Sequence, residues 1–371
     1  MQVTRLEARN FRGFAEVSFE PAPGLNLITG DNGAGKTSLL EALHLMAYGR
    51  SFRGRVRDGL VRAGTSALEV FVEWREGQNA ASDGERSARR AGLRHNGQAW
   101  TGRLDGAAVS HLTELCAALA VVSFEPGSHA LISGGAENRR RFLDWGMFHV
   151  EQDFVSVSRR YSRALRQRNA LLKARASAGH LDAWDHELAE AGEPLTRGRQ
   201  RYVDALLPLL QETGAELVPS VGMLTAEYAP GWRRDEMPLA DALLLARSRD
   251  MMMGYTSVGP HRGDWRVRLG DLPGREALSR GQTKLVALAA LLSQAEHHAH
   301  VRGDWPIVAL DDLSSELDRV HQGRILQRLL ATGSQVFATG TEVPASMREL
   351  PGEFALFHVE HRSIEHFPAP D

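Results

Sequence analysis

The sequence contains little cysteine and little lysine, and both shortages limit what the protein can be. Cys116 is the single cysteine among 371 residues, which excludes an internal disulfide and a cysteine-based metal site. Such a chain fits a reducing compartment, and we expect a cytoplasmic protein. Of the 44 basic residues, only Lys36, Lys173 and Lys284 are lysines. A genome-wide bias toward arginine accounts for this, and we expect a remaining lysine where a compact ammonium fits better than a planar guanidinium.

Long apolar runs and a dominant charge are also missing. Stretches such as Val286–Leu292 are too short to cross a bilayer, and the first residues lack the layout of a signal peptide, so we expect no membrane segment. The formal net charge is −2, so any nucleic-acid surface must be local. The length and the 43% hydrophobic content predict one large or two medium folded domains.

Residues 30–37 form a complete phosphate-binding loop. They satisfy the pattern G-x-x-x-x-G-K-[ST], with a β-type run before them at 25–29 and helical apolar spacing after them at 38–46. A chance match is improbable when strand and helix lie on the correct sides. Lys36 would bridge the β- and γ-phosphates, and the Thr37 hydroxyl would hold Mg²⁺. The expected nucleotide contacts are Gly30, Asp31, Asn32, Gly33, Ala34, Gly35, Lys36, Thr37 and Ser38.

A second segment ends in two acids. The apolar run Ile307–Leu310 precedes Asp311 and Asp312. In a phosphate-loop ATPase the first acid holds Mg²⁺ and the next can polarise the attacking water. Acids also end strands at ordinary turns, but the phosphate loop favours the catalytic interpretation. The predicted catalytic residues are Lys36, Asp311 and Asp312, and the predicted metal ligands are Thr37 and Asp311.

A third segment, Ser279-Arg280-Gly281-Gln282, precedes a helix that begins near Thr283. Ser279 and Gly281 at a helix N-terminus can form an anion site from a hydroxyl, backbone N–H groups and the helix dipole. The alternative is an ordinary serine N-cap, which is common. The acids downstream, followed by Ser-Glu-Leu-Asp at 315–318, favour the anion site.

Together these segments resemble the ABC-type ATPase head of the SMC-like group, and within it the RecF family of bacterial recombination-repair proteins. The resemblance extends over nearly the whole chain. It implies an α/β fold, an ABC/SMC-type P-loop ATPase head with a mixed sheet and flanking helices, plus a mainly helical second lobe inserted in it. We expect the ATPase lobe at 1–115 and 290–371, and the helical lobe with the signature motif at 116–289. Further matching segments are Asn10–Gly13, Gly49–Arg53, Arg139–Asp144, Gly259–Arg262 and Ser279–Lys284.

The resemblance also implies how the site works. ATP and Mg²⁺ would lie between two heads of an ATP-dependent homodimer, with Gly30–Thr37, Asp311 and Asp312 acting in one chain. Ser279, Gly281 and Gln282 would close the site from the partner chain, and Arg12 is a further expected nucleotide contact. Asp312 stands where the wider ABC group commonly has glutamate, and this shorter carboxylate predicts slow hydrolysis.

The implied biology is DNA repair. The partners would be double-stranded and gapped or junction DNA, and RecR, with RecO and the RecA recombinase through it, in replication-fork maintenance linked to the SOS response. Two departures from the family pattern stand out. Gly263 stands where a further acid is expected, and Thr339-Gly340-Thr341 lacks the histidine that many ABC heads place there. Thr339 or Thr341 could donate a hydrogen bond in its place.

The remaining pattern is helical in the middle and mixed at the ends. Strands are expected at 1–20 with a turn near Arg12, at 67–76, 92–103 and 121–124, and helices at 136–169, 181–191 and 194–214. Residues 216–275 suggest strands and loops. The last hundred residues predict helices at 281–298 and 319–330, with strands at 307–310, 335–339 and 354–360.

Arginine-rich segments mark candidate DNA contacts, above all 154–175, which contains no acid. In 154–175, Arg159, Arg163 and Arg166 fall on one helix face and could contact phosphates. A solvated helix face in an arginine-rich proteome explains the pattern equally well. No pattern of interleaved aromatic residues suggests stacking on single strands, so duplex backbone binding is favoured. Other candidates are Arg139, Arg140 and Arg141, and Arg53, Arg55 and Arg57, of which the last three could instead touch nucleotide.

Other function classes fit less well. A transporter ATP-binding subunit has a much shorter phosphate-loop-to-signature interval. A true SMC protein needs a coiled coil longer than this interval allows, since a helix of 100 residues reaches only about 150 Å. The guanine-reading pattern Asn-Lys-x-Asp of GTPases is missing. A DNA-binding scaffold that binds ATP without turnover remains an alternative, and phosphate release with and without gapped duplex separates the two.

Overall fold

The computed structural model describes residues 1–54, 56, 59–77, 88–270, 272–344, 347 and 354–367. The chain divides into two compact units, Met1–Ser128 with Gln294–Asp371 (unit 1) and His129–Ser293 (unit 2). The first boundary lies later than the expected 115/116, because β8 (Val121–Phe124) pairs in parallel with β11 (Ile307–Leu310) inside unit 1. The second boundary falls within α8 (Arg280–Arg302).

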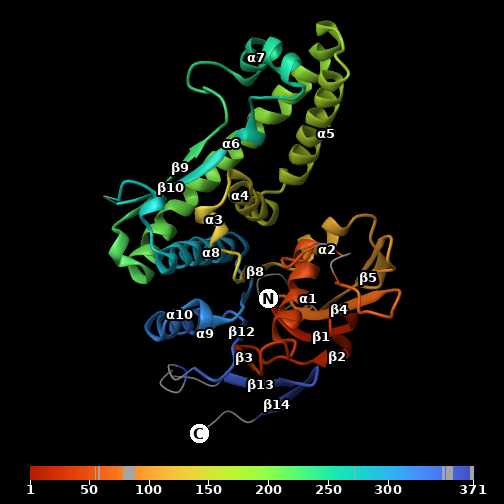
Figure 1. Ribbon diagram of the computed structural model, residues 1–371, viewed down its shortest axis with the longest axis vertical. Helices are drawn as coiled ribbons and strands as arrows, with labels where there is room; N and C mark the ends of the chain where they lie inside the picture. Colours follow the sequence, from red (N-terminus) through yellow and green to blue (C-terminus); the bar gives the residue numbers. More distant parts are fainter. Residues whose placement is uncertain are drawn as a thin grey trace. The chain divides into compact units, whose positions relative to one another are not determined.

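Unit 1 contains two six-stranded sheets (Figure 1). The first is antiparallel, in the order β2-β1-β4-β5-β6-β7. Its strand β4 alternates between buried and partly exposed positions, as a strand with one face on the core must. The candidate strand at 92–103 is in fact two strands separated by a turn. The strands are β1 (Gln2–Phe11), β2 (Phe14–Phe19), β4 (Leu68–Arg75), β5 (Ala88–His95), β6 (Trp100–Leu104) and β7 (Ala107–Ala108).

The second sheet has the order β14-β13-β3-β12-β11-β8, and only the β13–β14 pair is antiparallel. Every residue of β3, β11 and β12 is buried, which explains their continuous apolar runs. The strands new to this sheet are β3 (Leu25–Thr29), β12 (Val336–Thr339), β13 (Phe354–Glu360) and β14 (Ser363–Phe367). The other helices of unit 1 are α2 (Leu112–Ala118), α9 (Leu313–Glu316) and α10 (Arg319–Ala331).

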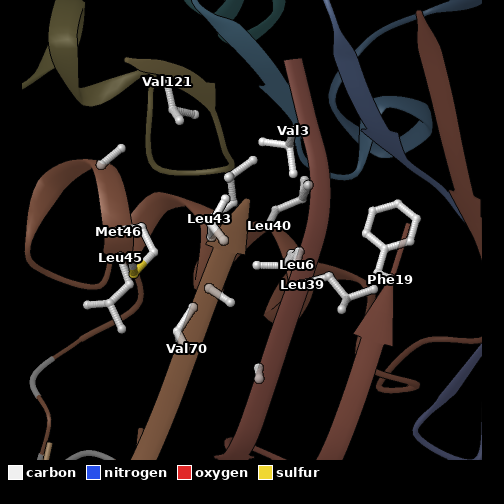
Figure 2. Close-up of a cluster of buried hydrophobic side chains, with 14 of the residues drawn as sticks. Val3, Leu6, Phe19, Leu39, Leu40, Leu43, Leu45, Met46, Val70 and Val121 are labelled. Atoms are coloured by element: carbon white, nitrogen blue, oxygen red, sulfur yellow. The ribbon is translucent and has the colours of Figure 1, made fainter. Parts of the chain in front are cut away.

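Helix α1 (Lys36–Tyr48) is the centre of the unit 1 core. Eleven of its 13 residues are buried, because α1 contacts β1 and β4 of the first sheet and β8 and β12 of the second. Each fully buried leucine contributes about 1.5–3 kcal/mol, so the phosphate loop at the start of α1 is firmly anchored. Figure 2 shows α1 residues Leu39, Leu40, Leu43, Leu45 and Met46 among Val3, Leu6, Phe19, Val70 and Val121.

Unit 2 is mainly helical, as expected. Helix α6 (Ala178–Leu217) runs through Pro194 and Pro208 where two helices were predicted, and it packs along α5 (Phe154–Lys173) (Figure 1). The predicted helix 136–169 is interrupted between Val150 and Phe154. Among the described residues the remaining elements are α3 (Ala130–Ser133), α4 (Ala136–Val150), α5 (Phe154–Lys173), α6 (Ala178–Leu217), the antiparallel pair β9 (Leu224–Ala229) and β10 (Asp264–Leu269), α7 (Leu239–Met253), and three short 3₁₀ turns at 219–221, 260–262 and 275–277.

The prediction of strands and loops over 216–275 missed α7. Its buried face carries Leu239 and Leu243, but Leu245 and Met252 are 72% and 83% exposed. Apolar residues on both faces conceal the helical period that the sequence would otherwise show. None of the described helices has both the length and the apolar character needed to cross a membrane.

A buried ion network joins the long helices of unit 2. The Arg168 side chain on α5 is fully buried; its Nη1 donates to Asp250 Oδ2 of α7 at 2.7 Å and to Thr256 Oγ1 at 2.9 Å. Its Nε donates to Asp185 of α6. A buried guanidinium depends on these acceptors, because the alternative is an uncompensated charge in a low-dielectric environment.

Replacing Asp250 by alanine should therefore destabilise unit 2 by about 3–5 kcal/mol. The matched control is Glu187→Ala, which removes the partner of the exposed Arg160 and should cost about 0–1 kcal/mol. Urea unfolding followed by circular dichroism measures both. Equal, small losses for the two variants would show that the Arg168 network is not a source of stability.

Candidate nucleotide-binding site

The phosphate loop lies between β3 and α1. Parallel strands place their carboxyl ends at one edge of a sheet, so the loop lies at the same edge as the ends of β11 and β12. Gly30 opens the loop with φ 144°, and a Cβ there would lie 2.3 Å from the Val359 carbonyl oxygen of β13. Glycine is therefore required where the loop leaves β3.

Lys36 is held inside the loop. It is 8% exposed, and its Nζ donates to the Gly30 carbonyl at 2.6 Å and to the Asp31 carbonyl at 2.9 Å. Burial lowers the pKa of Lys36, while the carboxylates of Asp312, Asp311 and Asp31 oppose that shift. The Lys36 and Thr37 N–H groups belong to the first turn of α1, which offers no helical acceptor for them. These donors together favour a bound anion.

Asp311 is the meeting point of three segments. Its Oδ1 accepts hydrogen bonds from Thr37 Oγ1 at 3.0 Å and from Thr339 Oγ1 at 2.8 Å. It is 3% exposed, and burial raises its pKa while the two hydroxyls oppose the shift. The Asp312 N–H donates to Thr339 Oγ1 at 2.8 Å. The structure thus brings the predicted metal ligands Thr37 and Asp311 together.

Thr339 occupies the position considered for a substitute of the missing histidine. Its hydroxyl is buried and used by Asp311 and by the Asp312 amide, whereas Thr341 is exposed. Thr339 therefore orients the two acids in this structure. The sequence alone could not decide between Thr339 and Thr341. The pairing of β12 with β11 decides, because it places Thr339 beside Asp311.

A cavity of about 430 Å³ lies in front of the loop. Arg12, the further expected nucleotide contact, lines it, and its guanidinium is paired with Glu41 of α1, with 2.9 Å from Nε to Oε2. The sequence pattern did not indicate Glu41 as part of this site, although Glu41 is fully buried and lies one helical turn after Thr37. Arg362, also missed, lines the cavity from the β13–β14 turn. Arg53 lines it too, while Arg55 and Arg57 lie outside the described residues. Besides these arginines the lining comprises Gly13, Phe14, residues 32–38, Gly59, Asp312 and Thr339.

The serine segment begins α8 in unit 2. Gln282 N donates to Ser279 Oγ at 3.2 Å, and Ser279 N donates to Gln282 Oε1 at 2.9 Å. This reciprocal capping box is the ordinary N-cap expected as the alternative. Ser279, Arg280 and Gly281 are nevertheless exposed, and a Cβ at Gly281 would meet open space. The helix N-terminus is therefore accessible to a ligand.

The candidate DNA-binding arginines fall into two groups. Arg139 is 6% exposed and pairs with Asp264 through Nε at 2.7 Å and Nη2 at 3.1 Å, so it stabilises unit 2 and is withdrawn as a DNA contact. Arg140 is partly buried and donates to the Gly263 carbonyl at 2.9 Å. Arg141 is exposed beside Glu137. On α5, in contrast, Arg159, Arg163 and Arg166 are all exposed.

A hollow of about 510 Å³ lies beside two of these α5 arginines. Arg159 and Arg163 line it together with Trp184, which comes from α6. Tyr161 lies among these arginines in sequence but is buried, whereas Trp184 belongs to a different helix and could not be found from the arginine run. Arg160 is paired with Glu187 across the same hollow, so its charge is partly neutralised.

Comparisons with known proteins agree with this architecture. The family model of the RecF/RecN/SMC N terminal domain matches residues 2–356. The chain is 64% identical to the DNA replication and repair protein RecF of Stenotrophomonas maltophilia (strain R551-3), covering 99% of this chain and 100% of the relative. The RecF of Thioalkalivibrio sulfidiphilus (strain HL-EbGR7) is 40% identical, over 98% and 99% of the two chains. The chain therefore belongs to the RecF family.

Solved structures show the same fold. The recombination mediator protein RecF-ATP in the RecFOR pathway superposes with a TM-score of 0.86 at 25% identity, covering 99% of this chain and 98% of that one. An SMC head bound to the C-winged helix domain of ScpA gives 0.61 at 15% identity, over 99% and 97% of the two chains. The predicted fold class, an SMC-like ATPase head with a helical lobe, is confirmed.

Replacing Thr339 by valine should remove the hydrogen bonds that orient both acids. We expect unit 1 to lose about 1–3 kcal/mol at neutral pH, whereas Thr339→Ser retains the hydroxyl and most of the stability. Because the lost bond favours ionised Asp311, the penalty should be smallest at a pH where this carboxyl is protonated. It should grow as the pH rises through the raised pKa of Asp311. Denaturant unfolding between pH 3.5 and 8 tests this, and a pH-independent penalty would contradict it.

Proposed function

We propose that this member of the RecF family is a DNA-binding ATPase of recombinational repair and replication-fork maintenance. The observation that carries the proposal is the convergence of Lys36, Thr37, Asp311 and Asp312 at one sheet edge. The 3.0 Å hydrogen bond between Thr37 and Asp311 joins residues from opposite ends of the chain. The solved RecF–ATP relative supports ATP as the ligand.

The residues present suit ATP with Mg²⁺. The N–H groups of the loop and the Lys36 ammonium would take the β- and γ-phosphates, with Lys36 exchanging its two carbonyl acceptors for phosphate oxygens. Thr37 and Asp311 offer the oxygen ligands that Mg²⁺ prefers, and the ion would supply charge neutralisation at the phosphates. The described residues contain no cluster of three or more His, Cys, Asp or Glu that could hold a metal, so phosphate oxygens and water would complete the shell.

Asp312 is the proposed water-polarising residue. Its backbone is held in a left-handed conformation with φ 52°, and its amide is fixed by Thr339, so the carboxylate is presented to the cavity that it lines. Aspartate is one methylene shorter than glutamate and would hold the water less closely. Hydrolysis is therefore expected to be slow, which suits a switch between ATP-bound and free states.

The serine segment would complete a second chain's site. Ser279, Gly281 and Gln282 belong to unit 2, and the exposed N-terminus of α8 presents a hydroxyl and backbone N–H groups. Placed against the γ-phosphate of a partner head, they would make dimerisation depend on ATP. The active form would then be a homodimer with two shared sites.

The DNA substrate would be a double-stranded or gapped duplex. The exposed arginines of α5 offer charge without base-reading chemistry, so binding would be independent of sequence and sensitive to salt. By relationship to the RecFOR proteins, RecR, and through it RecO and RecA, would be the partners at gaps, in the cytoplasm and under SOS control.

The substitution Asp312→Asn tests the catalytic assignment. It should abolish steady-state phosphate release, because an amide cannot polarise the attacking water, and leave ATP-driven dimers in sedimentation intact. The control Asp312→Glu should raise turnover, because the longer carboxylate reaches the water better.

The variant Ser279→Arg tests the partner-chain contact, and it should bind ATP without dimerising. Normal hydrolysis by the Asn variant would remove Asp312 from this role, and a wild type that binds DNA and ATP without any turnover would favour the scaffold.

Reversing the charges of Arg159, Arg163 and Arg166 to glutamate tests the DNA surface. The slope of log affinity against log salt should fall by about 2–3, because each lost phosphate contact removes roughly 0.9. ATP-dependent dimerisation should be retained. The matched control reverses the exposed Arg201, Arg233 and Arg268, which change the net charge equally elsewhere on unit 2. Equal losses in the two triple variants would point to a general charge effect rather than a binding surface.

A further inference from the structure

The turn between β13 and β14 has an unusual composition. Glu360 pairs with Ser363, so His361 and Arg362 are the two turn residues, with φ 51° and 65°. Two-residue hairpin turns with both φ values positive favour Asn-Gly, because side chains with a Cβ strain there. Strained non-glycine residues that persist in a structure are a reason to look for a function.

The position of this turn is tied to the phosphate loop. Strand β13 pairs in parallel with β3, which ends where the loop begins, and Thr29 Oγ1 donates to the Phe357 carbonyl at 3.1 Å. Gly30 packs directly on the Val359 carbonyl. Figure 1 shows β13 and β14 beside β3. The turn therefore lies at a fixed place next to the site.

The Arg362 side chain extends into the cavity over Gly13. A Cβ at Gly13 would lie 2.9 Å from Arg362 Nε and 3.2 Å from its Cζ, so the close approach depends on glycine there. Arg362 lines the same cavity as Lys36. Within the described part of the chain, no carboxylate or other acceptor binds its guanidinium, whereas Arg12 in the same cavity is paired with Glu41. The Arg362 guanidinium therefore lines the cavity and is available to bind a ligand.

The cavity has a buried end and an exposed end. Lys36 and Asp311 are buried at the phosphate-binding end, whereas Arg362 is exposed at the mouth. A nucleotide that places its phosphates on the loop must therefore hold its nucleoside nearer the mouth. A guanidinium is planar and can stack on a purine face, which an ammonium cannot do as well.

We infer that Arg362 contacts the nucleoside half of the bound ATP and that Gly13 leaves the space for it. The inference rests on the proposed ATP site and adds to it a residue that no sequence motif indicates. The strain of the His361-Arg362 turn is then explained, since the turn directs the guanidinium over Gly13. Lys36 then binds the phosphates of the ligand, and Arg362 contacts its nucleoside.

The variant Arg362→Gly tests this without endangering the fold, because glycine is the residue this turn conformation favours. Calorimetric titration of the full chain should show ATP binding about tenfold weaker and inorganic tripolyphosphate binding unchanged. Arg362→Lys should also bind ATP more weakly than wild type, because it retains the charge without the plane. The control Lys36→Ala should lose affinity for both ligands.

Gly13→Ala provides an independent arm. Its backbone is outside the left-handed region, so alanine adds only the Cβ that displaces Arg362. The substitution should weaken ATP binding in the wild-type background and have no further effect in the Arg362→Gly background, as expected for two residues that act through one contact.

The outcomes separate this inference from the proposed function. Wild-type ATP affinity in Arg362→Gly would overturn the role of Arg362 and leave the ATP site standing. An equal loss of tripolyphosphate affinity would assign Arg362 to the phosphates and overturn the nucleoside contact. A wild-type chain that binds neither ligand would overturn the proposed function, and the inference with it.

Discussion

The hydrogen bonds of Asp311 are the constraint on which the site depends. One buried carboxylate oxygen accepts from Thr37 at the start of α1 and from Thr339 at the end of β12, while Asp311 itself directly follows β11. Burial makes the ionised carboxyl costly, as its raised pKa shows, and the two hydroxyls offset part of that cost. The relative positions of α1, β11 and β12 are therefore coupled to the position of one oxygen atom, and a shift of any of them would leave a buried charge with fewer donors.

Most cationic groups of the cavity are likewise held by internal partners. Lys36 is satisfied by loop carbonyls and Arg12 by Glu41, so each has a partner before any ligand arrives. A ligand must then exchange bonds rather than supply new ones, which lowers the net gain for each contact but keeps the groups in place. Preorganisation of this kind favours discrimination between ligands over raw affinity. In the described chain Arg362 is the contrasting case, since its guanidinium has no internal partner.

Much of unit 1 could be predicted because its signals are local. The phosphate loop, the apolar runs of β3, β11 and β12, and the paired acids each fall within a few consecutive residues, and the rule that parallel strands align their ends does the rest. The signals that failed depend on contacts between distant segments. Within its own run of arginines, Arg139 has the pattern of a solvent-exposed cation. In the structure it pairs with Asp264, which is distant in sequence and follows the unexpected Gly263. Helix α7 shows apolar residues on both faces, and nothing in its own sequence reveals which face packs on α5 and α6.

The two kinds of arginine in unit 2 illustrate a general limit on reading charge from sequence. Arg168 and Arg166 are two residues apart on one helix, yet one is fully buried among three acceptors and the other is exposed. Helical geometry explains the contrast, since residues two apart point about 200° from each other around the axis. The helix period therefore places some arginines of one run in the buried interior and others on the exposed surface. An arginine count therefore overestimates the exposed charge, and helix packing leaves the i, i+4, i+7 set of Arg159, Arg163 and Arg166 at the surface.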